Sequence, residues 1–183
     1  MPELAISRLT IASPVGPLAL RADGSHLIGL DFIDRNAVNH QDNPTDQDNL
    51  ADPRDLAASC RATTPLLAET ARQLAAYFAD RLELFDLPLA PAGTVFQRRV
   101  YDALLAIPYG TTKTYGHLAQ ELGSVARAVG GACGANPIPI IIPCHRILAG
   151  GGKTGGFSGG RGVSTKLQLL QLESRRLVLT CPS

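Results

Sequence analysis

The sequence predicts an α+β protein with two parts: a small N-terminal antiparallel β-sheet domain with a helix, and a mostly helical C-terminal domain. Three observations support this prediction. Apolar and polar residues alternate over residues 3–32, which is typical of strands. After residue 94 the apolar residues recur at helical spacing instead. Residues 1–89 hold seven arginines and thirteen acidic residues, a net charge of −6, whereas residues 90–183 hold ten basic and three acidic residues, a net charge of +7.

The opposite charges of the two halves indicate two domains with different partners. We place the boundary after residue 89, inside the segment 87–93, which has the proline and glycine content of a linker. The net charge of the whole chain is only +1, a value that by itself argues against a nucleic-acid binder. The basic second half nevertheless indicates that one face of the molecule binds a polyanion.

The N-terminal domain is expected to begin with three antiparallel strands within residues 3–32. Pro14-Val-Gly-Pro17 and Asp23-Gly24 are turn sequences that separate three alternating runs. Residues 34–63 are rich in Asn, Asp and Gln, which indicates an acidic surface loop, with a short helix near residues 56–60.

Pro65 suits the first turn of a further helix, which is expected to run to about Asp80. The second half then begins at residues 94–97 with the capping-box pattern Thr-x-x-Gln, and a helix follows until Pro108-Tyr-Gly110 ends it.

Two short helices come next. Thr114 is expected to cap the first and Ser124 the second, with Gly123 in the tight turn between them. This arrangement predicts a helix-turn-helix. In the second helix, Gly130 and Gly131 cost about 1 kcal/mol each relative to alanine. The predicted core face of this helix consists of Val125, Ala128, Val129 and Ala132, and a small-residue face consists of Ala126, Gly130 and Cys133, with Arg127 beside it.

The small-residue face has two interpretations that the segment alone leaves open. Short side chains would let the helix enter the minor groove of DNA, which is only about 6 Å wide. Alternatively, the glycines pack against another helix.

The reactive residues are predicted to follow an apolar segment. Residues 138–143 are apolar and bounded by prolines, as in a buried strand, and they lead directly to Cys144-His145-Arg146. A thiol becomes a nucleophile when a nearby base or positive charge favours its thiolate, and His145 is a candidate base. Taken without its flanks, Cys144 would more commonly be a small buried hydrophobe.

The residues on either side of Cys144 favour the nucleophile over the buried hydrophobe. The segment Arg127-Ala-Val-Gly-Gly…Asn136-Pro-Ile-Pro-Ile-Ile-Ile-Pro-Cys144-His145-Arg146 resembles the signature of the O6-alkylguanine-DNA alkyltransferases, also called methylated-DNA–protein-cysteine methyltransferases. The resemblance covers most of the chain and is weakest over residues 34–63. Further matching segments are Ser13–Leu18, Tyr77–Leu89, Phe96-Gln97, Ile107–Gly110, Thr114–Ala119, Gly156–Gly160 and Lys166–Glu173.

The resemblance implies a ribonuclease-H-like N-terminal domain, a winged-helix-like helix-turn-helix and a single-turnover DNA repair reaction. Cys144 would take the alkyl group from O6 of a guanine and keep it as a thioether. His145, through a water, would take the thiol proton, and Glu173 would orient that histidine. Asn136 would tie the recognition helix to the active-site segment, and Tyr115 would offer its hydroxyl to the leaving guanine.

The resemblance also implies that double-stranded DNA containing O6-alkylguanine is the partner and that the damaged base flips out of the helix. Arg127 would fill the vacated space and Ser158 would contact the base. O4-alkylthymine is a further candidate substrate. The implied DNA-binding residues are Arg127, Ala126, Gly130, Tyr115, Thr114 and Ser158.

The chain departs from the family pattern at two places. Five residues, Arg161–Thr165, lie between Gly160 and Lys166, where many family members have three, and Gly134 stands where some relatives carry a larger or basic side chain. The metal-binding Cys/His set of some animal relatives has no counterpart in the N-terminal half. We therefore predict no cofactor and no metal.

Three alternatives belong to other functional classes. A non-enzymatic alkylguanine-lesion-binding protein would recruit other repair factors, but such relatives replace the cysteine that is present here. A free-standing transcriptional regulator and a Cys-His hydrolase fit the sequence less well. The absence of a signal-peptide pattern or C-x-x-C pair predicts a cytoplasmic protein with reduced thiols, expected to act as a monomer and away from membranes.

Overall fold

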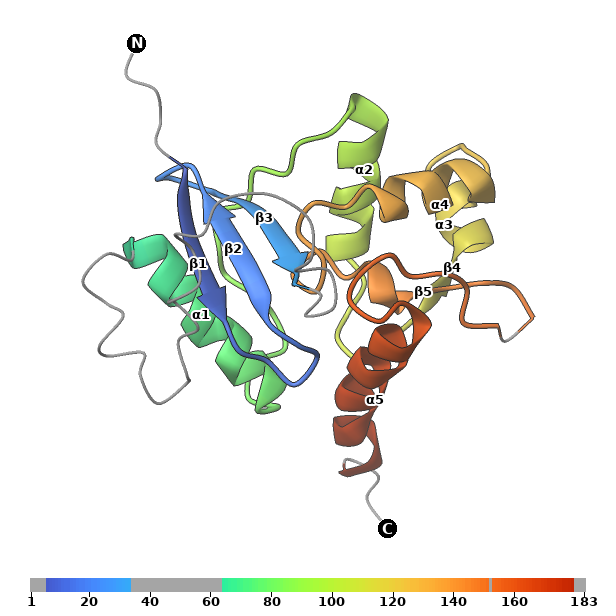
Figure 1. Cartoon of the computed structure of the whole chain (residues 1–183). Helices are drawn as coiled ribbons and strands as arrows, with labels where there is room; N and C mark the ends of the chain where they lie inside the picture. Colours follow the sequence, from blue (N-terminus) through green and yellow to red (C-terminus); the bar gives the residue numbers. More distant parts are fainter. Residues whose placement is uncertain (1–5, 34–63, 152, 180–183) are drawn as a thin grey trace. The chain divides into compact units, whose positions relative to one another are not determined.

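The computed structural model describes residues 6–33, 64–151 and 153–179, and the chain divides into two compact units, Met1–Ala90 and Pro91–Ser183 (Figure 1). The architecture is α+β, as predicted. The predicted acidic loop over 34–63 and the short helix near residues 56–60 lie outside the described residues.

The first unit contains a three-stranded antiparallel sheet in the order β1 (Ser7–Ile11), β2 (Leu18–Ala22), β3 (Leu27–Phe32), which confirms the three predicted strands. Helix α1 (Pro65–Phe78) lies along one face of the sheet (Figure 1). Alternate residues of the strands are buried because only one face of each strand points toward the helix. The side chains that fill this core include Leu9, Leu18, Leu20, Leu30, Leu67, Leu74 and Tyr77.

Helix α1 begins close to its predicted start and ends two residues early. The Leu67 N–H donates to the Thr64 hydroxyl, 3.4 Å away, and Pro65 occupies the first turn. Asp80, the predicted last residue, has a φ of 56°. This left-handed conformation is incompatible with a continuing α-helix, so the chain turns there.

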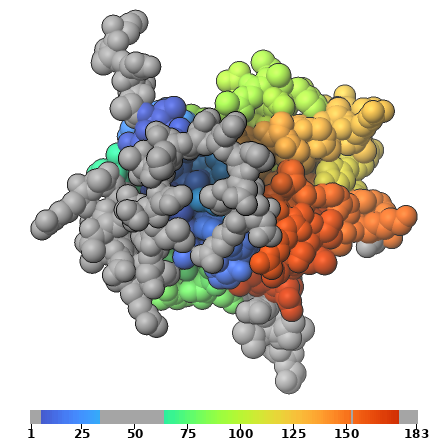
Figure 2. All heavy atoms as spheres, viewed as in Figure 1, coloured from blue at the N-terminus to red at the C-terminus, as the bar shows by residue number. Residues whose placement is uncertain are grey.

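The second unit is mostly helical. Its elements are α2 (Val95–Leu105), β4 (Lys113–Thr114), α3 (Tyr115–Glu121), α4 (Ala126–Gly134), the 3₁₀ helix η2 (Cys144–Arg146), β5 (Ile147–Leu148) and α5 (Val163–Leu179). The predicted capping box of α2 is present: the Thr94 N–H donates to Gln97 Oε1 at 2.7 Å, and the Gln97 N–H donates to Thr94 Oγ1 at 3.2 Å. Strands β4 and β5 pair in parallel, and the segment from β5 to α5 projects from this unit (Figures 1 and 2).

The helix-turn-helix consists of α3 and α4, and its first predicted cap is confirmed. The His117 N–H donates to Thr114 Oγ1 at 3.1 Å, and Gly123 has the positive φ, 63°, that the turn requires. The second predicted cap is wrong. Val125 is the N-cap of α4, and its apolar side chain has no oxygen that could accept a capping bond. Ser124 lies one position earlier, at the end of α3, where its N–H donates to the Ala119 carbonyl at 2.8 Å.

The predicted faces of α4 are also only partly correct. Val125 is 65% exposed and Ala128 is exposed, whereas Val129, Ala132 and Cys133 are buried. The N-terminal turn of α4 therefore extends into solvent, and the core contact is made by the i, i+3, i+4 stripe that begins at Val129.

The predicted strand over residues 138–143 is wrong, although its burial is confirmed. The segment is a compact turn in which the Ile142 N–H donates to the Ile138 carbonyl at 2.9 Å and Ile140 has a φ of 74°. Prolines at positions 137, 139 and 143 lack the N–H groups that a strand ladder needs. Cys144 and His145 consequently lie in η2 rather than on opposite faces of a strand.

Within the described residues, no helix is both long enough and apolar enough to span a lipid bilayer.

Candidate active site

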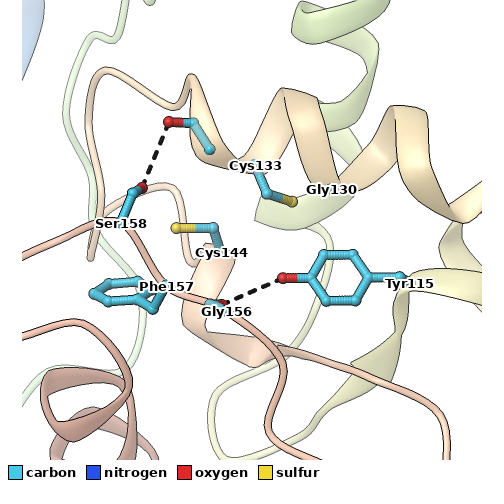
Figure 3. A pocket seen from close by; sticks show the side chains of 8 residues that line it. Tyr115, Gly130, Cys133, Cys144, Gly156, Phe157 and Ser158 are labelled. Carbon is cyan, nitrogen blue, oxygen red and sulfur yellow. Dashed lines mark hydrogen bonds between the residues drawn. The ribbon is translucent and has the colours of Figure 1, made fainter.

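A cavity of about 410 Å³ lies in the second unit beside Cys144 (Figure 3). Three parts of the chain form it: the end of α4, the start of η2, and the segment that precedes α5. Tyr115, the first residue of α3, forms a further side. The lining residues are Tyr115, Gly130, Cys133, Gly134, Cys144, Gly156, Phe157 and Ser158.

Cys144 is 5% exposed, and its N–H donates to the Ile142 carbonyl at 2.8 Å. Burial raises the pKa of the Cys144 thiol because a thiolate loses hydration there. A hydrogen bond from the Asn136 side chain and the positive charge of Lys166 act in the opposite direction and lower this pKa. The nucleophile is therefore a thiol at rest, and the site must help to form its thiolate.

His145 is fully buried and contacts Glu173: Nε2 of the imidazole lies 2.8 Å from Oε1 of the carboxylate. Burial lowers the pKa of His145 and outweighs the opposing effect of Glu173. A neutral imidazole that donates from Nε2 to a carboxylate has its Nδ1 free to accept. Among the described residues, Nδ1 of His145 is a buried side-chain nitrogen with no hydrogen-bond partner.

Arg146 is a component of this cluster to which the sequence assigned no role. Its Nε and Nη2 lie 2.9 and 3.0 Å from the two carboxylate oxygens of Glu173, and its Nη1 donates to the Ile107 carbonyl at 2.6 Å. Burial alone would raise the pKa of Glu173, but the hydrogen bonds from His145 and Arg146 outweigh it and hold that pKa at about 2. Glu173 is thus ionised, and the nearby positive charge of Arg146 adds to the effect of burial in keeping His145 neutral.

Asn136 holds the turn that precedes Cys144. Its Nδ2 donates to the Ile142 carbonyl at 2.8 Å, and its Oδ1 accepts from the Ile138 N–H at 3.0 Å. Because Asn136 lies two residues after the end of α4, these two bonds connect the recognition helix to the residues that lead into η2. The same side chain also lowers the pKa of the Cys144 thiol, against the effect of burial.

Tyr115 and Ser158 lie on opposite sides of the cavity (Figure 3). The Tyr115 hydroxyl donates to the Gly156 carbonyl at 3.5 Å, and the Ser158 hydroxyl donates to the Gly134 carbonyl at the same distance. Both bonds are long, so both hydroxyls are available to a ligand. Burial, and then the thiols of Cys133 and Cys144, raises the pKa of Tyr115 to about 12, which keeps its hydroxyl a donor.

A second hollow, of about 480 Å³, shares Tyr115 and Gly130 with the cavity beside Cys144. Five of the six predicted DNA-binding residues line it, and the sixth, Ser158, lines the cavity beside Cys144. Arg127 is exposed on the first turn of α4. The residues of the second hollow are Thr114, Tyr115, Gly116, Ala126, Arg127, Gly130, Ala149 and Gly150.

The glycines of α4 are open rather than packed against another helix. A Cβ at Gly131 or Gly134 would meet no atom within 4 Å, and a Cβ at Gly130 would lie 4.0 Å from the Tyr115 ring. Of the two interpretations of the small-residue face, this geometry favours a surface that a ligand can approach closely.

Sequence reasoning also missed one chemical group that lines the cavity and one that lies beside it. Cys133, which was placed on the small-residue face, is a second buried thiol in the lining, and burial raises its pKa to about 12. Lys166 is a buried lysine whose ammonium group contacts three backbone carbonyls. A lysine at an apolar position of a helix is the signal that could have identified Lys166. No comparable signal marked Cys133.

Within the described part of the chain, no group of three or more His, Cys, Asp or Glu side chains is arranged to hold a metal ion.

Two family profiles match the chain. Residues 95–175 match "6-O-methylguanine DNA methyltransferase, DNA binding domain", and residues 6–91 match "6-O-methylguanine DNA methyltransferase, ribonuclease-like domain". Together the two profiles cover both structural units.

Individual relatives agree with these profiles. A methylated-DNA–protein-cysteine methyltransferase of Mycobacterium tuberculosis (strain H37Rv) is 41% identical over 169 residues, covering 91% of this chain and 92% of that protein. One of Methanosarcina barkeri is 41% identical over 169 residues, covering 91% and 96%. The crystal structure of M. tuberculosis OGT in complex with DNA superposes with a TM-score of 0.72 at 42% identity, covering 92% of this chain and 93% of that one.

Proposed function

The chain belongs to the 6-O-methylguanine DNA methyltransferase family, and we propose that it repairs O6-alkylguanine in DNA by transferring the alkyl group irreversibly to Cys144. The observation that carries the assignment to this residue is its place in the cavity, directly before a buried histidine that a carboxylate holds through Nε2. Both relatives above are named as methyltransferases, which gives no support to a protein that only binds the lesion.

The transfer is a single displacement at the alkyl carbon. The Cys144 sulfur forms a bond to that carbon while the bond between the carbon and O6 breaks, and the bonding electrons leave with the guanine. The product is a thioether, which has no easy hydrolytic release, so each molecule acts once. Restored guanine must also gain one proton, and the hydrogen bond from Tyr115 stabilises its developing negative charge.

His145 accepts the proton that Cys144 loses. Its free Nδ1 is the basic atom, and a water carries the proton between the two side chains. As the imidazole becomes positive, the ionised Glu173 stabilises it through the 2.8 Å contact at Nε2. Arg146 holds both carboxylate oxygens and thereby fixes the orientation of the whole group.

The damaged nucleotide must leave the base stack before Cys144 can reach it, at a cost of a few kcal/mol. Arg127 occupies the vacated space, and its planar guanidinium replaces part of the lost stacking and hydrogen bonding. The open small-residue surface of α4 lets the helix approach the minor groove. Ser158 contacts the flipped base in the cavity beside Cys144.

We assign DNA binding and alkyl transfer to residues 90–183, since every candidate side chain named above belongs to the unit Pro91–Ser183. Residues 1–89 form a separate N-terminal domain. A cytoplasmic location supports this chemistry, because Cys144 must stay reduced, and Cys133 and Cys144 are both free thiols in the structure.

Intact-mass spectrometry after incubation with an O6-methylguanine duplex tests the proposal. We expect one added methyl group per molecule, and peptide mapping should place it on Cys144 rather than on the neighbouring Cys133. The Cys144→Ser variant should bind the same duplex and gain no methyl group. A wild-type protein without any methylated species at saturating DNA would refute the transferase function.

A further inference from the structure

A lysine without a role in the steps above lies beside the cavity. Lys166, in the first turn of α5, is 0% exposed. Burial lowers the pKa of its ammonium group, since water no longer solvates the charge. A lysine is almost never fully buried unless its charge has partners, so the contacts of Lys166 indicate what the charge does.

The ammonium group donates to three backbone carbonyls: Ile147 at 2.5 Å, Thr154 at 2.7 Å and Gly156 at 3.3 Å. Ile147 directly follows η2, which carries Cys144. Gly156 lies on another side of the cavity and accepts the Tyr115 hydroxyl. One side chain therefore connects the segment of the nucleophile to the wall that faces Tyr115.

The three partners of Lys166 are neutral carbonyls, so they satisfy its hydrogen bonds without cancelling its charge. The charge acts on Cys144, whose pKa it lowers against the effect of burial, and reciprocally the two cavity thiols raise the pKa of Lys166. It also disfavours a positive charge on His145 and so helps to keep that base neutral at rest. Such interactions are stronger in a protein interior than in water.

We propose that Lys166 is a positioning residue of the alkyl transfer, which ties the Cys144 segment to the Gly156 wall and supplies the positive charge that stabilises the Cys144 thiolate as it forms. This inference rests on the proposed function of the same site. A compact ammonium with three donors suits three converging carbonyls, whereas the planar guanidinium of arginine would not fit them equally well.

The test compares full-length wild-type protein with Lys166→Met, which removes the charge and keeps most of the side-chain length. The rate of Cys144 modification by iodoacetamide is measured against pH, with peptide mapping to separate Cys144 from the other cysteines. We expect the midpoint of the profile to rise by about one pH unit in Lys166→Met, which slows modification at pH 7 about tenfold. In single-turnover methyl transfer, the rate at saturating DNA should fall while the DNA concentration for half-saturation stays the same.

Two further variants separate charge from packing. Lys153→Met removes the same charge from an exposed lysine of the same unit and should leave the pH profile unchanged. Lys166→Arg keeps the charge, so its midpoint should stay near the wild-type value while transfer slows because the carbonyl contacts fit poorly. This variant also serves if Lys166→Met does not fold: a midpoint about one pH unit higher in Lys166→Arg would overturn the electrostatic role.

A Lys166→Met profile that coincides with the wild-type profile would likewise overturn the inference. The iodoacetamide measurement needs no DNA, so it separates this inference from the proposed function. Wild-type protein that reacts with iodoacetamide but takes no methyl group from DNA would count against the proposed function alone.

Discussion

At the scale of single residues, the site depends on how a few buried charges are balanced. The carboxylate of Glu173 accepts hydrogen bonds from His145, from the guanidinium of Arg146 and from the Gly110 N–H, and among these three Arg146 supplies a permanent positive charge. Lys166 adds a positive charge with neutral partners. The outcome is a neutral imidazole at His145 and a protonated thiol at Cys144. Transfer of the proton from the thiol to the imidazole converts the sulfur into the nucleophile.

Because of Glu173, the stability of the folded protein should decrease at acid pH. The pKa of Glu173 is lowered from 4.5 to about 2 in the folded protein. The depressed value means that its stabilisation is present above pH 4.5 and is lost as the pH falls toward 2. Thermal unfolding measured across this window should show a decline in wild-type Tm. Glu173→Gln, whose side chain does not titrate, should have a lower Tm at pH 7 and a shallower decline, and equal slopes would contradict the assignment.

Arg127 should be needed for the repair of duplex DNA but not for the alkyl-transfer step itself. Arg127→Ala is expected to slow repair of an O6-methylguanine duplex at least tenfold, because nothing then replaces the extruded base. Its reaction with free O6-methylguanine base should keep the wild-type rate, since no base has to be flipped. Methyl transfer to both substrates is followed by mass spectrometry. Equal slowing on both would show that Arg127 does not act by filling the vacated space.

At the scale of elements, the main predictions from sequence hold where the signals are local. The capping box at Thr94, the cap at Thr114 and the turn at Gly123 are all found as predicted. Each depends on residues within four positions of one another, so the sequence contains the whole interaction. The prediction for Ser124 is wrong because the N-cap of α4 is the next residue, Val125, whereas Ser124 belongs to the end of α3 through its N–H.

The different roles of Thr114 and Ser124 predict different losses of stability when each is replaced by alanine. Thr114→Ala should destabilise the protein by about 1 kcal/mol, because the N–H of His117 loses its acceptor. Ser124→Ala should change stability by less than about 0.5 kcal/mol, since its backbone N–H, and not its side chain, makes the contact with Ala119. Urea unfolding measures both values. A larger loss for Ser124→Ala than for Thr114→Ala would show that the Ser124 side chain caps α4 after all.

The turn over residues 138–143 shows the opposite case. Its apolar composition predicted burial correctly but not conformation, because a short apolar run between prolines fits a strand and a compact turn equally well. The conformation is set by Asn136, which supplies a donor and an acceptor where the prolines cannot. This turn leads directly into the 3₁₀ helix η2, which contains Cys144 and His145.

At the scale of the whole molecule, charge is separated between the two halves of the chain. The first half carries −6 and the second +7, which nearly cancel in the net charge of +1. Not all of the positive charge is free for DNA, however. Lys113 pairs with Glu121 at 2.7 Å, Arg146 pairs with Glu173, and Lys166 is buried. DNA binding therefore relies on fewer exposed charges than the sequence count indicates.

This distribution predicts a salt-sensitive interaction confined to one half of the chain. Affinity for an O6-methylguanine duplex should fall linearly on a log–log plot as salt rises from about 50 to 200 mM, because bound cationic groups release counterions. Arg8→Ala removes an exposed charge from the first unit and should leave the slope unchanged. Fluorescence anisotropy with the Cys144→Ser variant measures binding without reaction. A salt-independent affinity, or a smaller slope for Arg8→Ala, would contradict this distribution.

The sequence by itself determined the three strands of the first unit, helices α1 and α2, the caps at Thr94 and Thr114, and the burial of residues 138–143, because these depend on near neighbours along the chain. The expected site residues came from the resemblance to a family. Tertiary structure alone decided what depends on distant partners. It joined Glu173 to both His145 and Arg146 across more than 25 positions, placed Lys166 against the carbonyls on either side of the cavity, and buried a second thiol at Cys133. Periodicity reports which side of an element is buried, but only the fold determines which charges meet there.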